Sequence, residues 1–264
     1  MFMTDSTLKT IFYMGVALWT TSGMNISLEA PAHSKKLTAL RTPAATKSLI
    51  LADIDSMLNV NTYRDADPVT WGHETCHGIA SRIRQIEGAN TNGFYCLGGN
   101  YIVLKEPKFT LKALAALIPK EHRGVIYQLY LVDQQRYWNE QPAYILDESF
   151  AYLNGTLVGL ELEDSQPYTT RYAMFGERPK ALERYPRPLP YAGPSRIEAT
   201  YVRSIEACVY SMYLMNACPA YDLRCAVAVL LARNLAIYQA IEGSPFMTAA
   251  VKEACEKLVA VGNG

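Results

Sequence analysis

Two histidines and a glutamate lie close together in residues 71–78, which read WGHETCHG. On a helix, His73 and His77 project from the same face about one turn apart, so their imidazoles can bind one metal ion. Glu74 lies about 100° further around the helix, where its carboxylate can reach a metal-bound water without being a ligand. Zinc lowers the pKa of such a water to about 7, and a carboxylate can accept its proton during attack on a carbonyl. The spacing therefore predicts metal-assisted hydrolysis.

A catalytic zinc site needs a third protein ligand and keeps a fourth coordination position open. In metzincins that ligand is a further histidine after a glycine in the same segment. The corresponding positions here hold Ala80 and Ile83, which excludes that class. Of the two remaining histidines, His33 lies in or beside the N-terminal leader and His122 in a turn after Pro119.

An acidic pair inside an apolar helical run offers the missing ligand. Residues 144–152 read YILDESFAY, and the apolar neighbours indicate that this helix is buried. A buried carboxylate is costly unless it is paired or bound to a metal, so we predict Glu148 as the third ligand. Asp147 and Asp164 are alternative ligands. Asp147 could otherwise orient a histidine from outside the coordination shell.

His73, Glu74 and His77, with the later residues 146–151 (LDESFA), resemble the gluzincin branch of the zinc metallopeptidases. The resemblance covers these two segments alone. It implies that His73, His77 and Glu148 bind Zn²⁺, that Glu74 is the general base, and that the substrate is a peptide or protein. It also implies a helical active-site half beside a small sheet whose edge strand holds extended substrate.

Sites of this kind often include a tyrosine or arginine that stabilises an oxyanion. Tyr144 and Tyr152 lie one turn on either side of the predicted glutamate ligand, on the same helix face. Tyr168, Arg171 and Tyr172 lie in a Pro/Tyr-rich segment further along the chain. Because the chain has 18 tyrosines and most tyrosines serve packing, the sequence singles out none of these residues.

Cys76 directly precedes His77, which raises a cysteine–histidine nucleophile as an alternative. Adjacent helical residues point about 100° apart, so we expect Cys76 to pack in the core instead. An even number of cysteines suits an exported protein with disulfides, and buried free thiols are the alternative. No Cys-x-x-Cys pair is present, which argues against a cysteine-built zinc site. The six cysteines are Cys76, Cys96, Cys208, Cys218, Cys225 and Cys255.

The helix that contains the two histidines has sequence signals at both ends. Asp67 is a predicted N-cap, Pro68 suits the first helical position, and the helix should stop before Gly88. Residues 94–104 predict a β-hairpin around a Gly-Gly-Asn turn, the candidate counterpart of the substrate-binding sheet. Residues 48–59 mix helix and strand character and predict neither clearly.

The second half of the chain predicts more helices. Thr110 caps a short helix that ends near Pro119, and residues 124–163 predict two helices separated near Pro142. Residues 164–194 contain six prolines interleaved with tyrosines, which predicts an ordered surface excursion or lid. Three C-terminal helices are expected beyond it, with start signals at Ser195, at Asp222 and at Ser244 followed by Pro245.

The composition favours a globular protein of α+β class that is predominantly helical. Half of the 264 residues are hydrophobic and 19% are charged, which is enough to bury a sizeable core. The 25 basic residues balance the 25 acidic ones, which argues against a phosphate-binding surface and a nucleic-acid partner. We expect a single zincin-like domain at residues 33–264, with a small β-hairpin or sheet and a C-terminal three-helix portion.

Residues 1–32 predict a leader. The apolar stretch at 11–19 has the length of a signal-peptide core, and residues 30–32 offer a small-x-small cleavage site. The stretch is too short to span a bilayer, which needs about 20 residues, so no stable membrane span is expected. We predict a secreted or periplasmic protein, or a cytoplasmic one if the leader is not a signal peptide.

The sequence thus predicts a zinc-dependent metallopeptidase. Two alternatives keep the same residues but change their task, because function depends on the cleft as well as on the ligands. One is a zinc hydrolase of a non-peptide amide. The other is a helical binding protein whose metal site is structural or vestigial.

Overall fold

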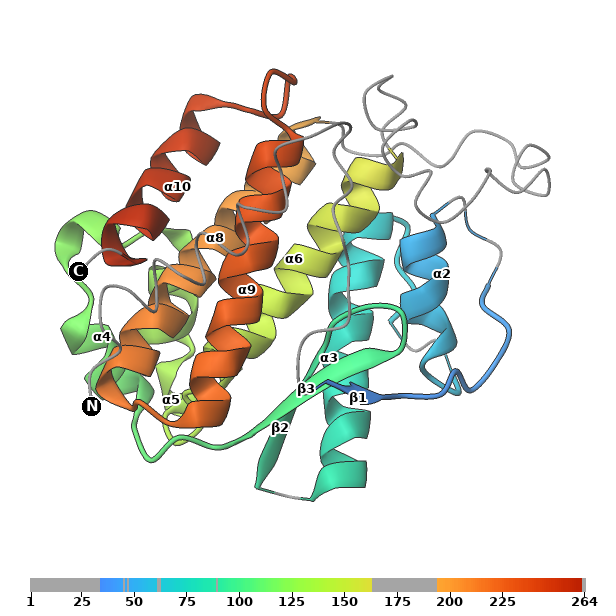
Figure 1. The fold of residues 1–264 in the computed structure, drawn as a ribbon, viewed down its shortest axis with the longest axis horizontal. Coiled ribbons are helices and arrows are strands. Elements are labelled where there is room, and N and C mark those ends of the chain that lie inside the picture. The colour runs from blue at the N-terminus through green and yellow to red at the C-terminus, as the bar shows by residue number, and fades with distance from the viewer. Residues whose placement is uncertain are drawn as a thin grey trace.

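The computed structural model describes residues 34–44, 46, 48–60, 63–88, 90–162 and 194–262. This part of the chain is mostly helical with one small sheet, so the predicted α+β, helix-rich class is confirmed (Figure 1). Several predicted features lie outside the described residues: the leader, residues 164–193, His33, Asp164, Tyr168, Arg171 and Tyr172.

The described sheet is antiparallel with strand order β1-β3-β2, and the helices precede and follow its hairpin in the chain. The strands are β1 (Lys35–Lys36), β2 (Thr91–Tyr95) and β3 (Asn100–Lys105). The α-helices are α2 (Leu49–Ser56), α3 (Pro68–Glu87), α4 (Leu111–Leu117), α5 (Gln135–Trp138), α6 (Tyr144–Leu162), α8 (Pro194–Ala217), α9 (Tyr221–Ala240) and α10 (Ala249–Gly262). A 3₁₀ turn, η1 (Lys120–His122), and a π-helix, η2 (Tyr127–Asp133), complete the described elements.

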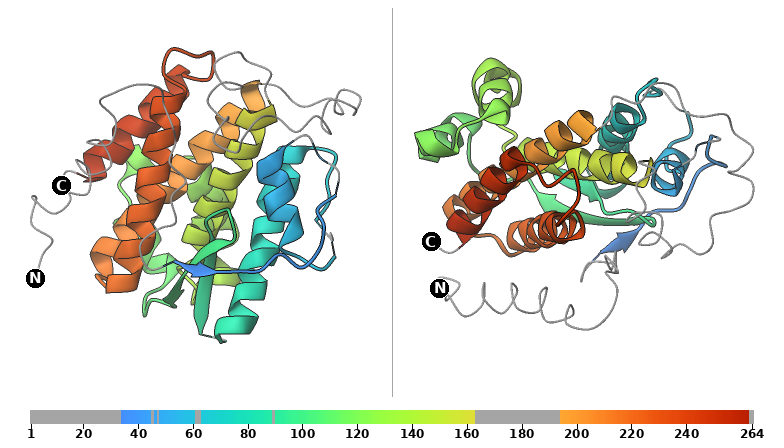
Figure 2. Two further views of the ribbon diagram at one scale, coloured as in Figure 1. Left: turned by 45° about the vertical axis from the view of Figure 1, so that its right-hand side comes forward. Right: turned by 90° about the horizontal axis from the view of Figure 1, so that it is seen from above.

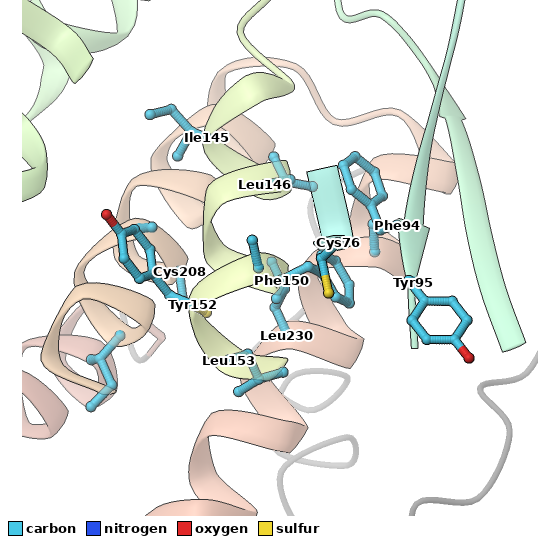
Figure 3. Packing of buried hydrophobic residues seen from close by; sticks show 14 of the residues in the cluster. Cys76, Phe94, Tyr95, Ile145, Leu146, Phe150, Tyr152, Leu153, Cys208 and Leu230 are labelled. Atoms are coloured by element: carbon cyan, nitrogen blue, oxygen red, sulfur yellow. The ribbon is translucent and has the colours of Figure 1, made fainter. Parts of the chain in front are cut away.

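Helix α6 forms the centre of the protein. It lies between α3 on one side and α8 on the other, and β2 also contacts it (Figures 1 and 2). From Ile145 to Leu160, every residue of this helix except Asp147 is buried. A helix that is apolar on all sides must be surrounded by other elements. Phe150 of α6 stacks on Phe94 of β2 with ring centroids 5.2 Å apart, next to Cys76 of α3 (Figure 3).

Helix α3 begins and ends where the sequence predicts. The Asp67 side chain caps it by accepting a hydrogen bond from Val69 N, Pro68 is its first residue, and Gly88 follows its last. Helices α3 and α6 approach closely at a glycine. A Cβ atom on Gly155 of α6 would lie 3.0 Å from the carbonyl oxygen of Val69. A side chain at this position would press on that carbonyl, so glycine suits the close approach.

The predicted hairpin is present, but its first strand starts three residues earlier, at Thr91. Its turn contains Leu97, Gly98 and Gly99, all with positive φ. The undecided segment at 48–59 forms α2. Its cap is the hydroxyl of Ser48, which accepts a hydrogen bond from Leu51 N.

Residues 124–163 differ from the two predicted helices. The first half forms the π-helix η2 and the single turn α5, and only the second half forms a long helix, α6. A π-helix contains one residue more per hydrogen-bonded ring than an α-helix, and the hydrophobic spacing of the sequence does not reveal it.

The three predicted C-terminal helices are present, but each begins away from its predicted signal. Helix α8 begins at Pro194, one residue before Ser195. Helix α9 begins at Tyr221, one residue before Asp222, and the Asp222 carboxylate accepts a hydrogen bond from Lys105 N of β3. Helix α10 begins at Ala249, five residues after Ser244. The hydroxyl of Ser244 bonds back to the Ile241 carbonyl at the end of α9, so it closes one helix instead of starting the next.

All six cysteines are free in the structure, so the alternative of free thiols holds. Four of them, among them Cys76, are buried in the core. Among the described helices, α9 has the length and mean hydropathy (1.2) of a candidate membrane span, with 44% of that stretch buried. Its buried residues, such as Leu223 and Leu230, belong to the same core as α6 and α8.

We predict that Gly155→Val lowers the free energy of unfolding by about 1–3 kcal/mol, because the added atoms force α6 away from the backbone of α3. Urea denaturation of the variant and the unmodified protein measures the difference. Gly262→Val is the matched control, since its Cβ would meet only the flexible end of Met212, at 3.5 Å. Equal losses in the two variants would contradict a special role for the α3–α6 contact.

Candidate metal centre

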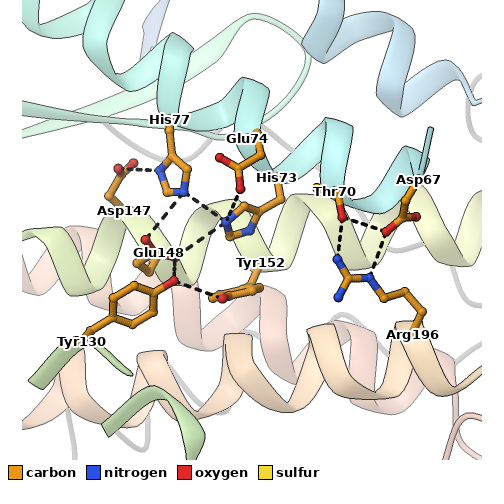
Figure 4. Close-up of polar contacts among 10 residues, drawn as sticks. All are labelled: Asp67, Thr70, His73, Glu74, His77, Tyr130, Asp147, Glu148, Tyr152 and Arg196. Carbon is orange, nitrogen blue, oxygen red and sulfur yellow. Dashed lines mark hydrogen bonds and ion pairs between the residues drawn. The ribbon is translucent and has the colours of Figure 1, made fainter. Parts of the chain in front are cut away.

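Helices α3 and α6 bring three predicted ligands together. His73 and His77 lie one turn apart on the face of α3 that meets α6, and Glu148 points toward them from α6 (Figure 4). One ligand atom from each of the three can be chosen so that all lie within 4.8 Å of one another. The predicted glutamate, 71 positions after His77 in the sequence, is therefore a neighbour of both histidines in space.

The separations between the donor atoms suit a single small cation. The Nε2 atoms of His73 and His77 lie 3.1 Å apart. Each Nε2 lies 3.7 Å from an oxygen of Glu148. Donors about 2.0–2.1 Å from a zinc ion at tetrahedral angles are about 3.3 Å from one another, so these residues fit such an ion with small adjustments.

One side of the metal-ligand group is buried in the core, and the other side faces solvent. Glu148 is 1% exposed and His73 is 8% exposed. By contrast, the side chain of Glu74 is 48% exposed, and its Oε1 lies 3.9 Å from His73 Nε2. Glu74 thus lies beside the ligand atoms, on the side that solvent reaches.

The alternative ligands occupy other positions. Asp147 accepts a hydrogen bond from His77 Nδ1 at 2.8 Å, so it orients the imidazole from behind and leaves Nε2 facing the group. This is the outer role that carboxylates commonly take around a metal-binding histidine. His122 lies in η1, where its Nδ1 is paired with the Tyr213 hydroxyl at 2.9 Å, and it is not part of the group.

Without a metal, His77 is the charged histidine. Burial alone would lower its pKa, but the negative charges of Asp147 and Glu148 and the hydrogen bond from Nδ1 to Asp147 raise the pKa of His77 to about 9. Burial raises the pKa of Glu148, and the neighbouring charge of His77 opposes that rise. The buried carboxylate is therefore compensated by an imidazolium.

His73 is the neutral histidine of the pair. Burial, together with the positive charges of His77, Arg196 and Arg203, holds the pKa of His73 well below its usual value. His77 Nε2–H can then donate to the free lone pair of His73 Nε2, at the observed 3.1 Å. That arrangement puts the hydrogen of His73 on Nδ1, which has no hydrogen-bond partner among the described residues.

Three tyrosines surround the carboxylate of Glu148. Tyr144 and Tyr152, one turn away on either side, were recognised in the sequence as neighbours. Tyr144 opposes the rise in the pKa of Glu148 that burial causes. Tyr130 of the π-helix η2 also donates to Glu148, at 2.8 Å, and lies 3.1 Å from the Tyr152 hydroxyl. Nothing in the sequence around Tyr130 indicates this contact, because only the tertiary fold brings Tyr130 of η2 against Glu148 of α6.

The N-terminal end of α3 is tied to α8 beside the group. Arg196 of α8 forms an ion pair with Asp67, at 2.9 Å, and donates to the hydroxyl of Thr70 (Figure 4). The same carboxylate that caps α3 therefore also fixes its position against α8. This contact holds the helix that contains both histidines from a second direction.

Cys76 has a packing role, as expected. Its thiol is buried at the contact of α3 with α6 and β2 (Figure 3). Burial raises the pKa of Cys76 to about 12, which keeps it protonated at neutral pH. The Asn154 side-chain amide lies 3.3 Å from the sulfur and donates to the Tyr95 carbonyl at 3.0 Å. A protonated thiol in this position is a poor nucleophile.

Comparison of the chain with protein-family models, with curated proteins and with solved structures finds no match. The likeness to gluzincins consequently rests on the residues of the site. What the structure itself provides is a buried group of two histidines and a glutamate that could hold a metal ion.

We predict that metal affinity rises with pH. A cation must displace the proton that His77 holds below a pKa of about 9, so the dissociation constant should fall about tenfold per pH unit between pH 6 and 8. Titration with Zn²⁺ in competition with a chelator of known affinity measures this. A flat profile over that range would contradict a site in which a proton and a metal compete for the same nitrogen.

We also predict that Asp147→Asn weakens metal binding by about 10–100-fold, because the amide no longer holds His77 in the tautomer that presents Nε2. The same chelator competition measures the loss. Glu253→Gln is the control, since Glu253 contacts Lys257 on the exposed surface of α10. Equal affinity in both variants would show that Asp147 has no part in the site.

Proposed function

We propose that the protein is a zinc-dependent peptidase of zincin-like design, in which His73, His77 and Glu148 hold the metal and Glu74 is the general base. The observation behind the proposal is the convergence of the three donors in the core with a fourth carboxylate at their solvent side. Two imidazoles and one carboxylate are a donor set of catalytic zinc sites in peptidases.

The number of ligands favours catalysis over a purely structural metal. Structural zinc sites are closed by four protein ligands, whereas catalytic sites use three and leave one position for water or substrate. The group found among the described residues has three members. Glu74 is not a member of this group: its side chain is half-exposed, and its Oε1 lies 3.9 Å from His73 Nε2.

The residues of the chain divide the task. When bound, Zn²⁺ would polarise the scissile carbonyl and lower the pKa of a coordinated water. Glu74 would accept the proton of the attacking water and pass it to the leaving amine. Asp147 holds His77, and the tyrosines around Glu148 hold the carboxylate in place.

A peptide or protein substrate belongs to the proposal, as does a location outside the cytoplasm. Extended substrate bound along an edge strand is part of the zincin-like design, and the hairpin of β2 and β3 is the candidate for it. A zinc hydrolase of a non-peptide amide would use the same four residues. Only the choice of substrate separates that activity from the proposed one.

Two glutamate variants test the proposal. Glu148→Gln should lose the metal, because an amide oxygen is a far weaker ligand than a carboxylate. Glu74→Gln should keep one zinc per chain and lower kcat/KM by at least about 100-fold, since it removes only the base. Elemental analysis measures the metal, and mass spectrometry of a diverse peptide pool measures cleavage.

Glu140→Gln, an exposed change in the same protein, is the control for both readouts and should match the unmodified protein. Zinc binding without cleavage of any peptide would favour the non-peptide hydrolase or a structural metal. Undiminished turnover in Glu74→Gln would refute its role as base. Zinc absent from every protein after reconstitution would refute the metal centre itself.

A further inference from the structure

A chain of hydrogen bonds leads from the metal group to Tyr152, whose ring lies beside an arginine. The Tyr130 hydroxyl donates to Glu148, and the Tyr130 and Tyr152 hydroxyls lie 3.1 Å apart. The Cζ of Arg203, on α8, lies 5.7 Å from the centroid of the Tyr152 ring, close enough for a cation–π contact.

The chemistry of the carboxylate fixes the direction of this chain, because a carboxylate can only accept hydrogen bonds. Tyr130 therefore gives its hydrogen to Glu148, and Tyr152 gives its hydrogen to Tyr130. The single hydrogen of each phenol is used within the chain, so neither tyrosine can donate to a substrate while the chain is intact. Arg203 takes no part in this chain and keeps its five N–H donors for another partner.

The guanidinium of Arg203 has no carboxylate partner among the described residues. Arg196, seven residues earlier and on the same face of α8, is paired with Asp67. Arg203 is half-buried, and the Tyr152 ring that it contacts also contacts a metal ligand, since the ring centroids of Tyr152 and His73 lie 4.3 Å apart. A partly desolvated cation with unused donors beside a reaction site favours an anionic partner.

We propose that Arg203 binds a carboxylate of the substrate and so sets the specificity of the site. The proposal rests on the proposed function. The carboxylate is either the C-terminal α-carboxylate of a peptide or the side chain of an acidic residue near the cleaved bond. Both present the planar pair of oxygens that a guanidinium binds with two parallel hydrogen bonds.

The test uses small probes that need no knowledge of the peptide sequence. These are the monohydroxamates of malonic, succinic, glutaric and adipic acid, each compared with its primary amide twin. The hydroxamate binds zinc, and the series of chain lengths lets the carboxylate reach Arg203. Calorimetry on the zinc-loaded protein should show that the best acid binds about 10–100-fold more tightly than its amide.

Arg203→Gln should abolish that preference and leave the affinity of the amide twins unchanged, whereas Arg203→Lys should retain part of it. Arg224→Gln is the control, since Arg224 of α9 hydrogen-bonds to the Pro219 carbonyl on the exposed surface, and it should keep the full preference. No preference in the unmodified protein, or equal weakening of acid and amide in Arg203→Gln, would overturn the proposal while hydroxamate binding still supports the metal centre. If no hydroxamate binds and no zinc is retained, the proposed function fails and this proposal with it.

Peptides then separate the two sources of the carboxylate. One sequence is made with a free C-terminus, with an amidated C-terminus, and amidated with a glutamate placed at successive positions. Selective cleavage of the free acid assigns Arg203 to the α-carboxylate, and cleavage of an amidated glutamate peptide assigns it to an acidic side chain. In either case Arg203→Gln should remove the selectivity, and equal cleavage of all versions would overturn the proposal.

Discussion

The close packing of α3 against α6 is the contact on which the rest of the site depends. Two of the three predicted ligands come from one helix and the third from the other, so the separation of the helices sets the distances between donors. Gly155 permits the approach, and the apolar surroundings of α6 resist any shift because interiors are close-packed. The ion pair of Arg196 with Asp67 adds a polar clamp at the end of α3. The geometry of the donor atoms therefore depends on how closely α3 and α6 pack.

A polar group inside such a core needs hydrogen-bond or charge partners from the protein, since water cannot reach it. Glu148 finds them in a charged histidine and the hydroxyls of tyrosines, and His77 in two carboxylates. The two histidines consequently have different protonation states although they share a helix and a motif. Their environments differ because only His77 lies against Asp147.

The part of the site that local rules determine could be predicted from the sequence. Helix α3 has its cap, its proline and its terminal glycine within the segment itself, and the spacing of His73 and His77 follows from helix geometry. Glu148 could be chosen because an acidic residue in an apolar run is costly without a partner. Tyr130 and Arg203 could not be chosen, because no local sequence signal indicates that these residues contact α6. The start of α10 failed for a similar reason: the capping residue Ser244 serves the preceding helix.

The π-helix η2 makes the site sensitive to a single backbone residue. A π-turn contains one residue more than an α-turn, and here that extra residue sets which side chains of 127–133 face α6. Removing one residue from this stretch would return it to α-helical spacing and rotate everything beyond the deletion by about 100°. Tyr130 would leave Glu148, and the chain of phenols to Tyr152 would be cut at its first link. Length in this short stretch is therefore constrained as strictly as residue identity, although its exposed side chains are free to vary.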